Sequence, residues 1–341
     1  MSEDMLGIRA PAKLPNLVKA AFEKARAAGD LTYYPTQAAI LKPGRSGIAF
    51  QLRFSPALAS KPKPAPPPPG AGEKKKPFNP FENPLASMIV AQLPPNHVLV
   101  LNKFAIVPEH FILATRTMKP QTHVLEADDI AAAYACIWAY HEDADEAGQE
   151  LFAFFNSGPH SGASQPHRHI QLLPVAQMRV GLEDTDGGSD WSVMADALSS
   201  SRSDAEVPFA VLTDRIASGA TAEQLHTAYV RLYKDAVRLL HPDENEDLAG
   251  EGEARISYNL AMTRTTMALC PRVAEGATIP NKSGEEEVGP VALNGTVLGG
   301  TALVKNEAEW DALREDPEKL LGVLSKIGVP STKGSATVSN L

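Results

Sequence analysis

The sequence predicts an α+β fold in which an antiparallel sheet is flanked by helices. Short runs with alternating apolar residues predict strands, and longer runs with helical periodicity predict the helices between them. Two pairs of strand runs lie close enough in the chain to form hairpins, namely 98–101 with 105–114 and 255–263 with 267–271. Further strands are predicted at 48–54, 151–155, 167–173 and 209–212, and helices at 16–28, 127–140 and 221–240.

Local signals support several of these elements. Gly29 follows the first helical run as a stop signal. Thr221 stands at the start of the last predicted helix, where its hydroxyl can cap the first turn, and Glu223 lies in that turn. Pro108 has no backbone N–H to donate, so we expect the second strand of the first hairpin to lie at a sheet edge or to contain a bulge.

The chain has 341 residues, which allows two domains or one large one. Residues 183–206 are acidic and rich in Ser, Asp and Gly, which predicts a loop or a domain boundary. We therefore expect an N-terminal domain over residues 1–182, a linker over 183–206 and a C-terminal domain over 207–341. The order strand, helix, paired strands recurs faintly in the second half, so we expect that half to be related to the first.

Residues 61–80 form a low-complexity insert rich in Pro and Lys. Such a segment cannot bury enough apolar surface to order itself, so we expect a flexible spacer inside the N-terminal domain. Its lysines at 74–76 then form a solvated run of charge.

Composition limits the possible partners. The 32 Lys and Arg residues are outnumbered by 41 Asp and Glu residues, and the net charge of −9 does not favour nucleic acid as a ligand. No run of about 18 apolar residues predicts a membrane span, and the first residues do not resemble a signal peptide. Two cysteines suit a reducing compartment. We expect a cytoplasmic protein that also has access to the nucleus and is a monomer.

Residues 156–171 contain the most informative motif, a turn rich in Gly and Ser that leads into His167, His169 and Gln171. Side chains alternate faces along a strand, so these three residues project from one surface. A loop that contains glycine can direct its backbone N–H groups at an anion. The motif therefore predicts a site for a phosphate-bearing molecule.

Three interpretations of the two histidines compete. A metal site would need a third protein ligand, and neither Cys136 nor Cys270 has a second Cys or His at ligand spacing. The histidines could simply be hydrogen-bonded strand residues, although the surrounding Ser, Gly and Gln are too polar for a packing face. In the third interpretation one neutral imidazole is a nucleophile toward a phosphoryl group.

The same residues resemble a known family. The segments Asn156-Ser-Gly-Pro, Ser161-Gly-Ala-Ser and His167-Arg-His-Ile-Gln are similar to the active-site signature of fungal-type diadenosine tetraphosphate (Ap4A) phosphorylases, also called ATP adenylyltransferases. That family belongs to the histidine triad superfamily, on the branch shared with galactose-1-phosphate uridylyltransferase. Four other segments share the resemblance and extend it over about residues 15–330: Ser60-Lys-Pro, Val98-Leu-Val-Leu-Asn-Lys-Phe to His110, Ser257-Tyr-Asn to Thr263, and Leu293-Asn-Gly.

The resemblance implies a histidine-triad-like fold and a double displacement. His169 would attack the α-phosphorus to form adenylyl-histidine, and inorganic phosphate would then release ADP, so that Ap4A and phosphate give ATP and ADP reversibly. His167 would orient the nucleophile. Gln171 stands where the hydrolase branch has a third histidine. Because an amide can donate to and accept from phosphoryl oxygens but does not shuttle protons at neutral pH, Gln171 favours transfer to phosphate over hydrolysis.

The resemblance also implies the substrate-binding residues. Asn102 would contact a ribose hydroxyl, with Leu101 beside it, and the remaining residues would contact the phosphates or the departing nucleotide: Lys61, Asn156, Gly162, Ala163, Ser164, Gln165, Gln171, Asn294 and Lys305. For six other histidines we expect structural or surface roles: His110, His123, His141, His160, His226 and His241.

Two alternative functions remain open in the sequence. One is a hexose-1-phosphate uridylyltransferase, which the contexts of Lys61 and Asn102 disfavour. The other is a sensor that binds dinucleoside polyphosphates without catalysis, which the intact His169 disfavours. We expect the partners to be small nucleotides and phosphate. No covalently bound cofactor and no protein metal ligands are expected, although Mg²⁺ can accompany the polyphosphate.

Overall fold

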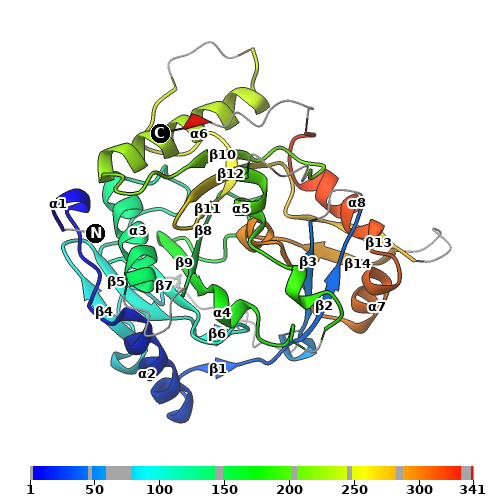
Figure 1. The fold of residues 1–341 in the computed structure, drawn as a ribbon, viewed down its shortest axis with the longest axis horizontal. Helices are drawn as coiled ribbons and strands as arrows, with labels where there is room; N and C mark the ends of the chain where they lie inside the picture. Colours follow the sequence, from blue (N-terminus) through cyan, green and yellow to red (C-terminus); the bar gives the residue numbers. More distant parts are fainter. Residues whose placement is uncertain are drawn as a thin grey trace, which may run out of the picture.

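The computed structural model describes residues 3–44, 48–58, 78–142, 149–183, 185–200, 206–243, 248–281, 287–331 and 339–340. A nine-stranded sheet runs through the middle of the molecule, as Figure 1 shows, and a separate apolar core lies on each of its faces. The predicted antiparallel sheet flanked by helices is confirmed. Its neighbouring strands pair antiparallel except at the last edge, where β16 (Ser339–Asn340) pairs parallel with β10 (Leu212–Arg215).

Each half of the chain contains the order strand, helix, strand, strand, and the three strands of each set are neighbours in this sheet. In the first half the last strand lies between the other two, in the order β7-β9-β8, with β5 and β4 outside β7. The second half has the same arrangement, β10-β12-β11. The elements of the first half are β4 (Ile89–Leu93), β5 (His97–Leu101), β7 (Phe111–Thr115), α3 (Ala127–Glu142), β8 (Leu151–Ser157) and β9 (His169–Pro174). Those of the second are β10, α6 (Ala222–Leu240), β11 (Ser257–Met262) and β12 (Thr266–Arg272).

Helices α2 (Leu14–Ala27), α3 and α6 cover one face of the sheet (Figure 1). Helix α3 is buried along most of its length, and its alanines at 131–133 and 135 allow the neighbouring elements to approach closely. Ile170 and Leu172 of β9 point into this core. The short helix α1 (Glu3–Leu6) packs beside α3.

The opposite face carries a second layer, which contains the sheet β15-β3-β2 and most of the remaining helices. Because side chains alternate along β9, Leu173 points into this layer, and so do His169 and Gln171. The layer consists of β2 (Gln37–Leu41), β3 (Phe50–Phe54), α4 (Val175–Met178), α5 (Met194–Ser199), β13 (Gly276–Pro280), β14 (Glu287–Ala292), η4 (Gly295–Gly299), β15 (Thr301–Val304), α7 (Glu307–Glu315) and α8 (Glu318–Ile327). Shorter elements are β1 (Thr32–Tyr33), β6 (Phe104–Ala105), η1 (Pro56–Leu58), η2 (Ala86–Met88) and η3 (Gly188–Asp190).

Most predicted elements are present with small shifts at their ends. Helix α2 begins two residues before the predicted start because Pro15 is tolerated in its first turn, and Gly29 follows it with a left-handed φ of 77°. The hairpin of β11 and β12 is confirmed. In α6, Thr221 Oγ1 accepts a hydrogen bond from Gln224 N, and Gln224 Oε1 accepts one from Thr221 N, so the predicted cap is confirmed.

Two predicted strands differ in detail from the structure, and the predicted loop or domain boundary contains more secondary structure than expected. The strand over 105–114 is interrupted, because Pro108 has no N–H and Glu109 has a φ of 59°; the chain turns there and β7 begins at Phe111. The stretch 183–206 is not a simple loop, since its described part contains η3 and α5 and completely buries Trp191. The strand predicted at 209–212 begins only at Leu212, because Phe209 makes no more than an isolated bridge to Pro330.

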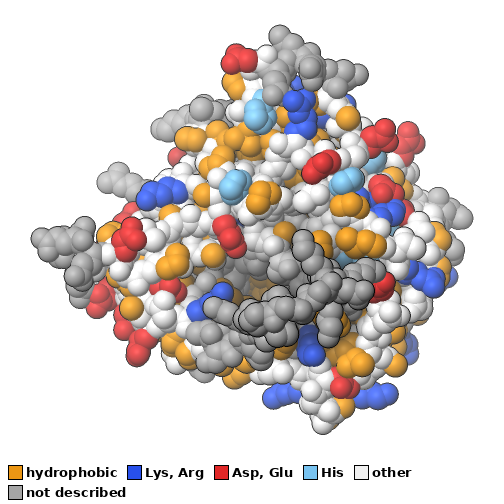
Figure 2. All heavy atoms as spheres, turned by 180° about the vertical axis from the view of Figure 1, so that it is seen from behind, with side chains coloured by type: hydrophobic (Ala, Val, Ile, Leu, Met, Phe, Trp, Pro, Cys, Tyr) orange, Lys and Arg blue, Asp and Glu red, His pale blue; other side chains and the backbone are white. Residues whose placement is uncertain are grey.

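The surface carries charges of both signs. On the face in Figure 2, Lys and Arg side chains lie scattered among Asp and Glu side chains. Within the described ranges, every helix is too short or too polar to span a bilayer.

The capping box of α6 makes a prediction about stability. Replacing Thr221 with Ala should lower the free energy of unfolding by about 1 kcal/mol, because the first turn loses a side-chain acceptor. Denaturant unfolding measures the loss, and Thr221→Ser is the matched control that retains the hydroxyl. Equal stability of the Ala and Ser variants would contradict a role for the cap.

Candidate active site

Strand β9 carries the histidine motif and lies between β7 and β8 in the interior of the sheet. His169 is opposite Ala114 of β7, and Gln171 is opposite Ile112 of β7 and Phe154 of β8. His167 precedes the strand and forms an isolated bridge with Pro120. Pairing on both sides fixes the direction of these side chains, so the motif lies on a rigid element.

The hydrogen bonds of His169 determine which ring nitrogen is free. Its Nδ1 lies 2.8 Å from the carbonyl oxygen of His167 and must donate a proton to it. The lone pair of the neutral ring is therefore on Nε2. The side chain is 4% exposed, and burial lowers the pKa of His169 to about 4, so the imidazole is neutral at physiological pH. A neutral, directed Nε2 is what a histidine nucleophile requires.

The ring of His167 is held at both nitrogens. Its Nε2 lies 2.8 Å from the carbonyl oxygen of Thr115 and donates to it, so Nδ1 is an acceptor. The side-chain amide nitrogen of Asn79 lies 2.8 Å from that Nδ1. Burial lowers the pKa of His167 from its ordinary value. His167 therefore contacts the nucleophile through its backbone carbonyl, and its ring is a fixed support.

Gln171 is oriented by His110, a residue for which the sequence predicts only a structural or surface role. Asn102 Oδ1 accepts from Phe104 N at 3.0 Å, so its Nδ2 donates to His110 Nδ1 at 3.0 Å. The proton of the neutral His110 ring is then on Nε2, and we assign its acceptor as Gln171, the other side-chain partner of this ring. Gln171 accepts through its carbonyl oxygen, and its NH₂ group remains available as a donor. Burial lowers the pKa of His110 to about 4, which keeps this tautomer neutral.

Gln121 is a further support that the sequence analysis missed. Its Oε1 accepts from His169 N at 2.7 Å, and its Nε2 donates to the carbonyl oxygens of Asn156 at 2.8 Å and of His169 at 3.2 Å. One buried amide therefore joins the start of β9 to the end of β8. Nothing in the sequence around Gln121 distinguishes it, because it lies in an irregular segment far from the motif.

The glycine-containing loop after β8 packs against the C-terminal half of the chain. Gly162 has a φ of 78°, and a Cβ at this position would lie 2.7 Å from Asn294 Cβ, so only glycine fits without a shift. Asn294 caps η4 by accepting from Thr296 N at 2.9 Å. The structure thus brings together two predicted binding residues from different halves of the chain.

Asn156 lies behind this loop. Its Oδ1 accepts from Asn259 Nδ2 at 2.9 Å and from Gly295 N at 2.8 Å. Asn259 Oδ1 in turn accepts from the buried guanidinium of Arg272. Asn156 is therefore 3% exposed and holds strand β8, strand β11 and η4 together, and its side chain does not line the cavity described next.

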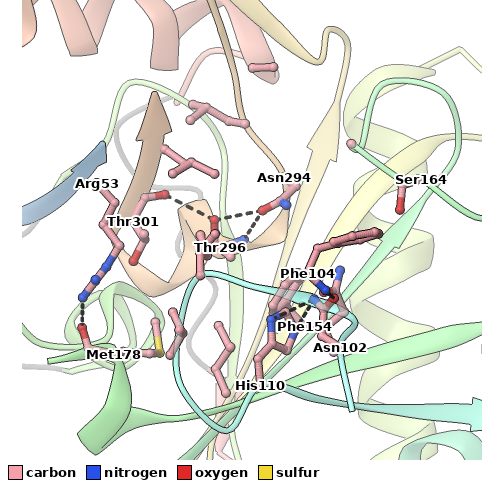
Figure 3. Close-up of a pocket in the computed structure, with 18 of the residues that line it drawn as sticks. Arg53, Asn102, Phe104, His110, Phe154, Ser164, Met178, Asn294, Thr296 and Thr301 are labelled. Carbon is pink, nitrogen blue, oxygen red and sulfur yellow. Dashed lines mark hydrogen bonds between the residues drawn. The ribbon is translucent and has the colours of Figure 1, made fainter. Parts of the chain in front are cut away.

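A cavity of about 340 Å³ lies beside Gln171, between the nine-stranded sheet and the second layer. In Figure 3, Ser164 lies toward one end, Arg53 and Met178 toward the other, and Asn102 and His110 between them. Six predicted binding residues line it: Asn102, Gly162, Ser164, Gln171, Asn294 and Lys305. Six predicted site residues in the described part of the chain are not among its lining: Leu101, Asn156, Ala163, Gln165, His167 and His169, the last of which lies on the same face of β9 as Gln171. Leu101 points into the opposite, helix-covered core, and Lys61 lies outside the described residues.

Arg53 is a second lining residue that the sequence analysis missed. It is 2% exposed, and its guanidinium donates to Gln51 Oε1, to Thr36 Oγ1 at 2.8 Å and to backbone carbonyls including that of Val180 at 3.1 Å. Burial lowers its pKa to about 10, and within the described ranges no carboxylate forms an ion pair with it. The signal was present, because Gln51 and Arg53 are the alternate residues of an otherwise apolar strand.

Arg168 points to the other face of β9. Its Nη1 lies 2.8 Å from both Asp129 Oδ2 and Glu126 Oε1, and Asp129 Oδ1 lies 2.8 Å from His97 Nε2. His97, Asp128 and Asp129 form the only group of three metal-type ligands in the described part of the chain. Because Arg168 already balances the Asp129 charge, this group serves as an anchor for β9.

Two family models match the chain. Residues 6–183 match the model of the Ap4A phosphorylase N-terminal domain, and residues 205–330 match that of the ATP adenylyltransferase C-terminal domain. The chain belongs to the Ap4A phosphorylase family. The first family model ends at residue 183 and the second begins at residue 205, at the two ends of the segment 183–206 that the sequence predicts to be a loop or domain boundary.

Similar proteins of this family are known from Saccharomyces cerevisiae. Protein APA1 is 27% identical over 334 residues, covering 95% of this chain and 97% of APA1. Diadenosine 5',5'''-P1,P4-tetraphosphate phosphorylase 2 is 28% identical over 321 residues, covering 92% and 94%. A crystal structure of yeast Ap4A phosphorylase Apa2 has a TM-score of 0.71 and 25% identity, covering 94% of this chain and 99% of that one. Other structures of Apa2 are complexes with AMP and with Ap4A.

Two of the buried histidines, His169 and His110, make a prediction about pH. His169 and His110 have a pKa of about 4 when folded and about 6.5 when unfolded, so the unfolded state binds more protons between these values. The contribution of each histidine to the free energy of unfolding should be fully present above pH 6.5. It should fall as the pH decreases toward 4, by up to about 3 kcal/mol for each histidine.

Denaturant unfolding of the wild type and of His169→Gln across this range isolates the contribution of one histidine. The stability of the variant should fall less steeply between pH 6.5 and 4. His160→Gln, which changes an exposed histidine, is the matched control and should follow the wild type. Parallel curves for all three proteins would mean that His169 does not resist protonation in the folded state.

Proposed function

We propose that this protein is a nucleotidyltransferase that cleaves Ap4A with inorganic phosphate through a covalent adenylyl-histidine. The observation that carries the proposal is the tautomer of His169. Its Nδ1 donates to a backbone carbonyl, which leaves a lone pair on Nε2, on the same face of β9 as the cavity residue Gln171.

In the first step, His169 Nε2 attacks the α-phosphorus of Ap4A. A P–N bond forms, the bond from that phosphorus to the bridging oxygen breaks, and ATP departs with the bond electrons. In the second step an oxygen of inorganic phosphate attacks the same phosphorus, the P–N bond breaks, and ADP is released. The sum is Ap4A and phosphate to ATP and ADP. It is reversible because one phosphoanhydride is broken and another is made.

Gln171 supplies donors to this reaction and no proton transfer. With its carbonyl oxygen taken by His110, its NH₂ group can donate to the phosphoryl oxygens as their charge grows in the transition state. Phosphate enters already ionised, whereas water would need a base. Each of the three supporting groups, His167, His110 and Gln171, has a fixed role in hydrogen bonding, which supports transfer to phosphate over hydrolysis.

The binding roles follow from position. Asn102 would hold a ribose hydroxyl, and Gly162, Ser164 and Asn294 would hold the phosphate chain with Lys305 at its outer part. Lys61, Leu101, Ala163, Gln165 and Asn156 are proposed to assist, the last by holding the loop in place. The Apa2 complexes with AMP and Ap4A support nucleotides as the ligands.

We also propose that the two halves are related histidine-triad-like units, with domains over 1–182 and 207–341 and a linker over 183–206. Their identical strand order supports this relationship. Strand β12 occupies in the second half the place of β9, yet it presents Ala268 and Cys270 to the corresponding face. The chemistry therefore belongs to the first half, and the second half supports it.

The remaining proposals concern its setting. Mg²⁺ would accompany the nucleotide, with no covalently bound cofactor and no metal held by the protein alone. The protein would be a monomer in the cytoplasm and also in the nucleus. A reducing compartment is in keeping with the two buried free thiols, Cys136 and Cys270, and burial raises the pKa of each to about 12.

Intact-protein mass spectrometry after brief incubation with Ap4A in phosphate-free buffer tests the proposed function. The wild type should gain the mass of one adenylyl group, and added phosphate should remove that mass with release of ADP. His169→Ala should form no adduct, since it lacks the attacking nitrogen.

His160→Ala is the matched control, because His160 is an exposed histidine in the loop between β8 and β9. This variant should still form the adduct. Tight binding of Ap4A by the wild type without adduct and without turnover in phosphate would refute the enzyme and favour a sensor. Turnover of a hexose-1-phosphate with a uridylyl adduct would favour the uridylyltransferase.

A further inference from the structure

A short segment at residues 79–81 covers the two histidines from outside the strand. The Phe81 ring lies 5.0 Å from the His169 ring, centroid to centroid, at an interplanar angle of 34°, and 5.5 Å from the His167 ring at 84°. One phenyl ring therefore touches both imidazoles. The segment belongs to no helix or strand of the sheet.

Phe81 is itself firmly placed. It is 5% exposed and forms a small apolar cluster with Val98 and Val100 of β5 and with Ile112 and Ala114 of β7. Ala114 is the residue opposite His169 in the sheet. The cluster thus surrounds the imidazole of His169 with apolar groups on the face where Phe81 lies, and this burial is what keeps the ring neutral.

Asn79 completes the segment through an amide whose orientation is determined. Its Oδ1 accepts from Phe81 N at 3.0 Å, so the donor that faces His167 Nδ1 at 2.8 Å is Nδ2. With Nε2 of His167 donating to the Thr115 carbonyl at 2.8 Å, Nδ1 accepts from Asn79, and the ring is held between these two partners. The carbonyl oxygen of that same residue receives the Nδ1 proton of His169.

We infer that Asn79 and Phe81 are positioning residues for the nucleophile: Asn79 fixes the proton and orientation of His167, and Phe81 keeps His169 dry so that its Nε2 retains the lone pair. Asn79 contacts His167 and Phe81 packs against both imidazole rings, so both residues act through the histidines. The inference rests on the proposed function for its kinetic consequence but not for its consequence on titration.

The charged and titratable groups around His169 are few. His110 and His167 lie on its own side of the sheet, and Glu82 follows Phe81 and acts on His167. Arg168 points to the opposite face, where Asp129 and Glu126 balance it. Removing the phenyl ring would therefore admit water to His169 without exposing it to a new charge.

Titration of the histidine rings by NMR in the full-length protein tests the inference without any turnover. Phe81→Ala should raise the pKa of His169 by roughly one unit or more toward the ordinary value. Phe81→Leu, which retains an apolar cover, should stay close to the wild type. His169→Gln assigns the resonance.

Asn79→Asp tests the other half. A carboxylate cannot donate to His167 Nδ1, so that nitrogen must itself carry a proton, and the pKa of His167 should rise by roughly one unit or more. Asn79→Ala, which adds no charge, should not produce this rise. An unchanged His167 titration in Asn79→Asp would overturn the role of Asn79.

Kinetics give the matching readout. In Phe81→Ala the rate of adenylyl transfer should fall about tenfold or more with little change in KM, and the acid limb of its pH profile should move up with the His169 pKa. Phe81→Leu should keep both the rate of adenylyl transfer and the acid limb of the pH profile close to those of the wild type.

The outcomes are distinguishable. If Phe81→Ala and Phe81→Leu titrate like the wild type, the inference fails whatever the protein catalyses. If the pKa values move as expected and the wild type forms no adduct, the proposed function fails and the positioning role stands. Should Phe81→Ala not fold, as unfolding curves would show, Phe81→Ser is the replacement, and an unchanged His169 pKa in it would again overturn the inference.

Discussion

The antiparallel pairing of β8 with β11 is the interaction on which the rest of the molecule depends. It joins the sheets of the two halves into one, with Asn156 opposite Asn259 in the register. Those two side chains are also hydrogen-bonded to each other, and Arg272 and Gly295 extend the bond into the second half. The register of a strand pair decides which side chains lie on each face of the sheet. The register of β8 and β11 therefore holds the loop after β8 against η4, and each half of the chain supplies one wall of the cavity.

The site combines rigidity with a free lone pair. Each neighbour of the nucleophile has its hydrogen bonds determined by something else: Gln121 by β8, His167 by Thr115 and Asn79, and Gln171 by His110. Such pre-organisation matters because a donor or nucleophile that needs no rearrangement contributes more to a transition state than one that must be reoriented. Burial then keeps the imidazoles neutral, at a cost to stability in acid.

The second half of the chain shows how one arrangement of strands can serve two purposes. Where β9 presents His169 and Gln171, β12 presents Ala268 and Cys270, which pack into an apolar core. Its contribution to the site comes through Asn294, Lys305 and the buried Arg272, which hold or line the cavity. A polar pair on β12 would have required buried partners that this core does not offer.

The sequence by itself determined the strand with its histidines, the glycine loop, the helix caps and the α+β class, because alternation, glycine and capping signals are local and are set by backbone geometry within a few residues. It also indicated the cavity residues near the motif, such as Gly162 and Ser164. Only the tertiary structure decided the partners of that motif. Phe81, Gln121 and His110 lie far from the motif in the sequence, and Arg53 is 116 residues before His169. Each reaches the site through pairing and packing that no local pattern encodes. The same holds for the turn at Pro108 and Glu109 that ends beside His110, since a contact between distant segments is a property of the whole fold.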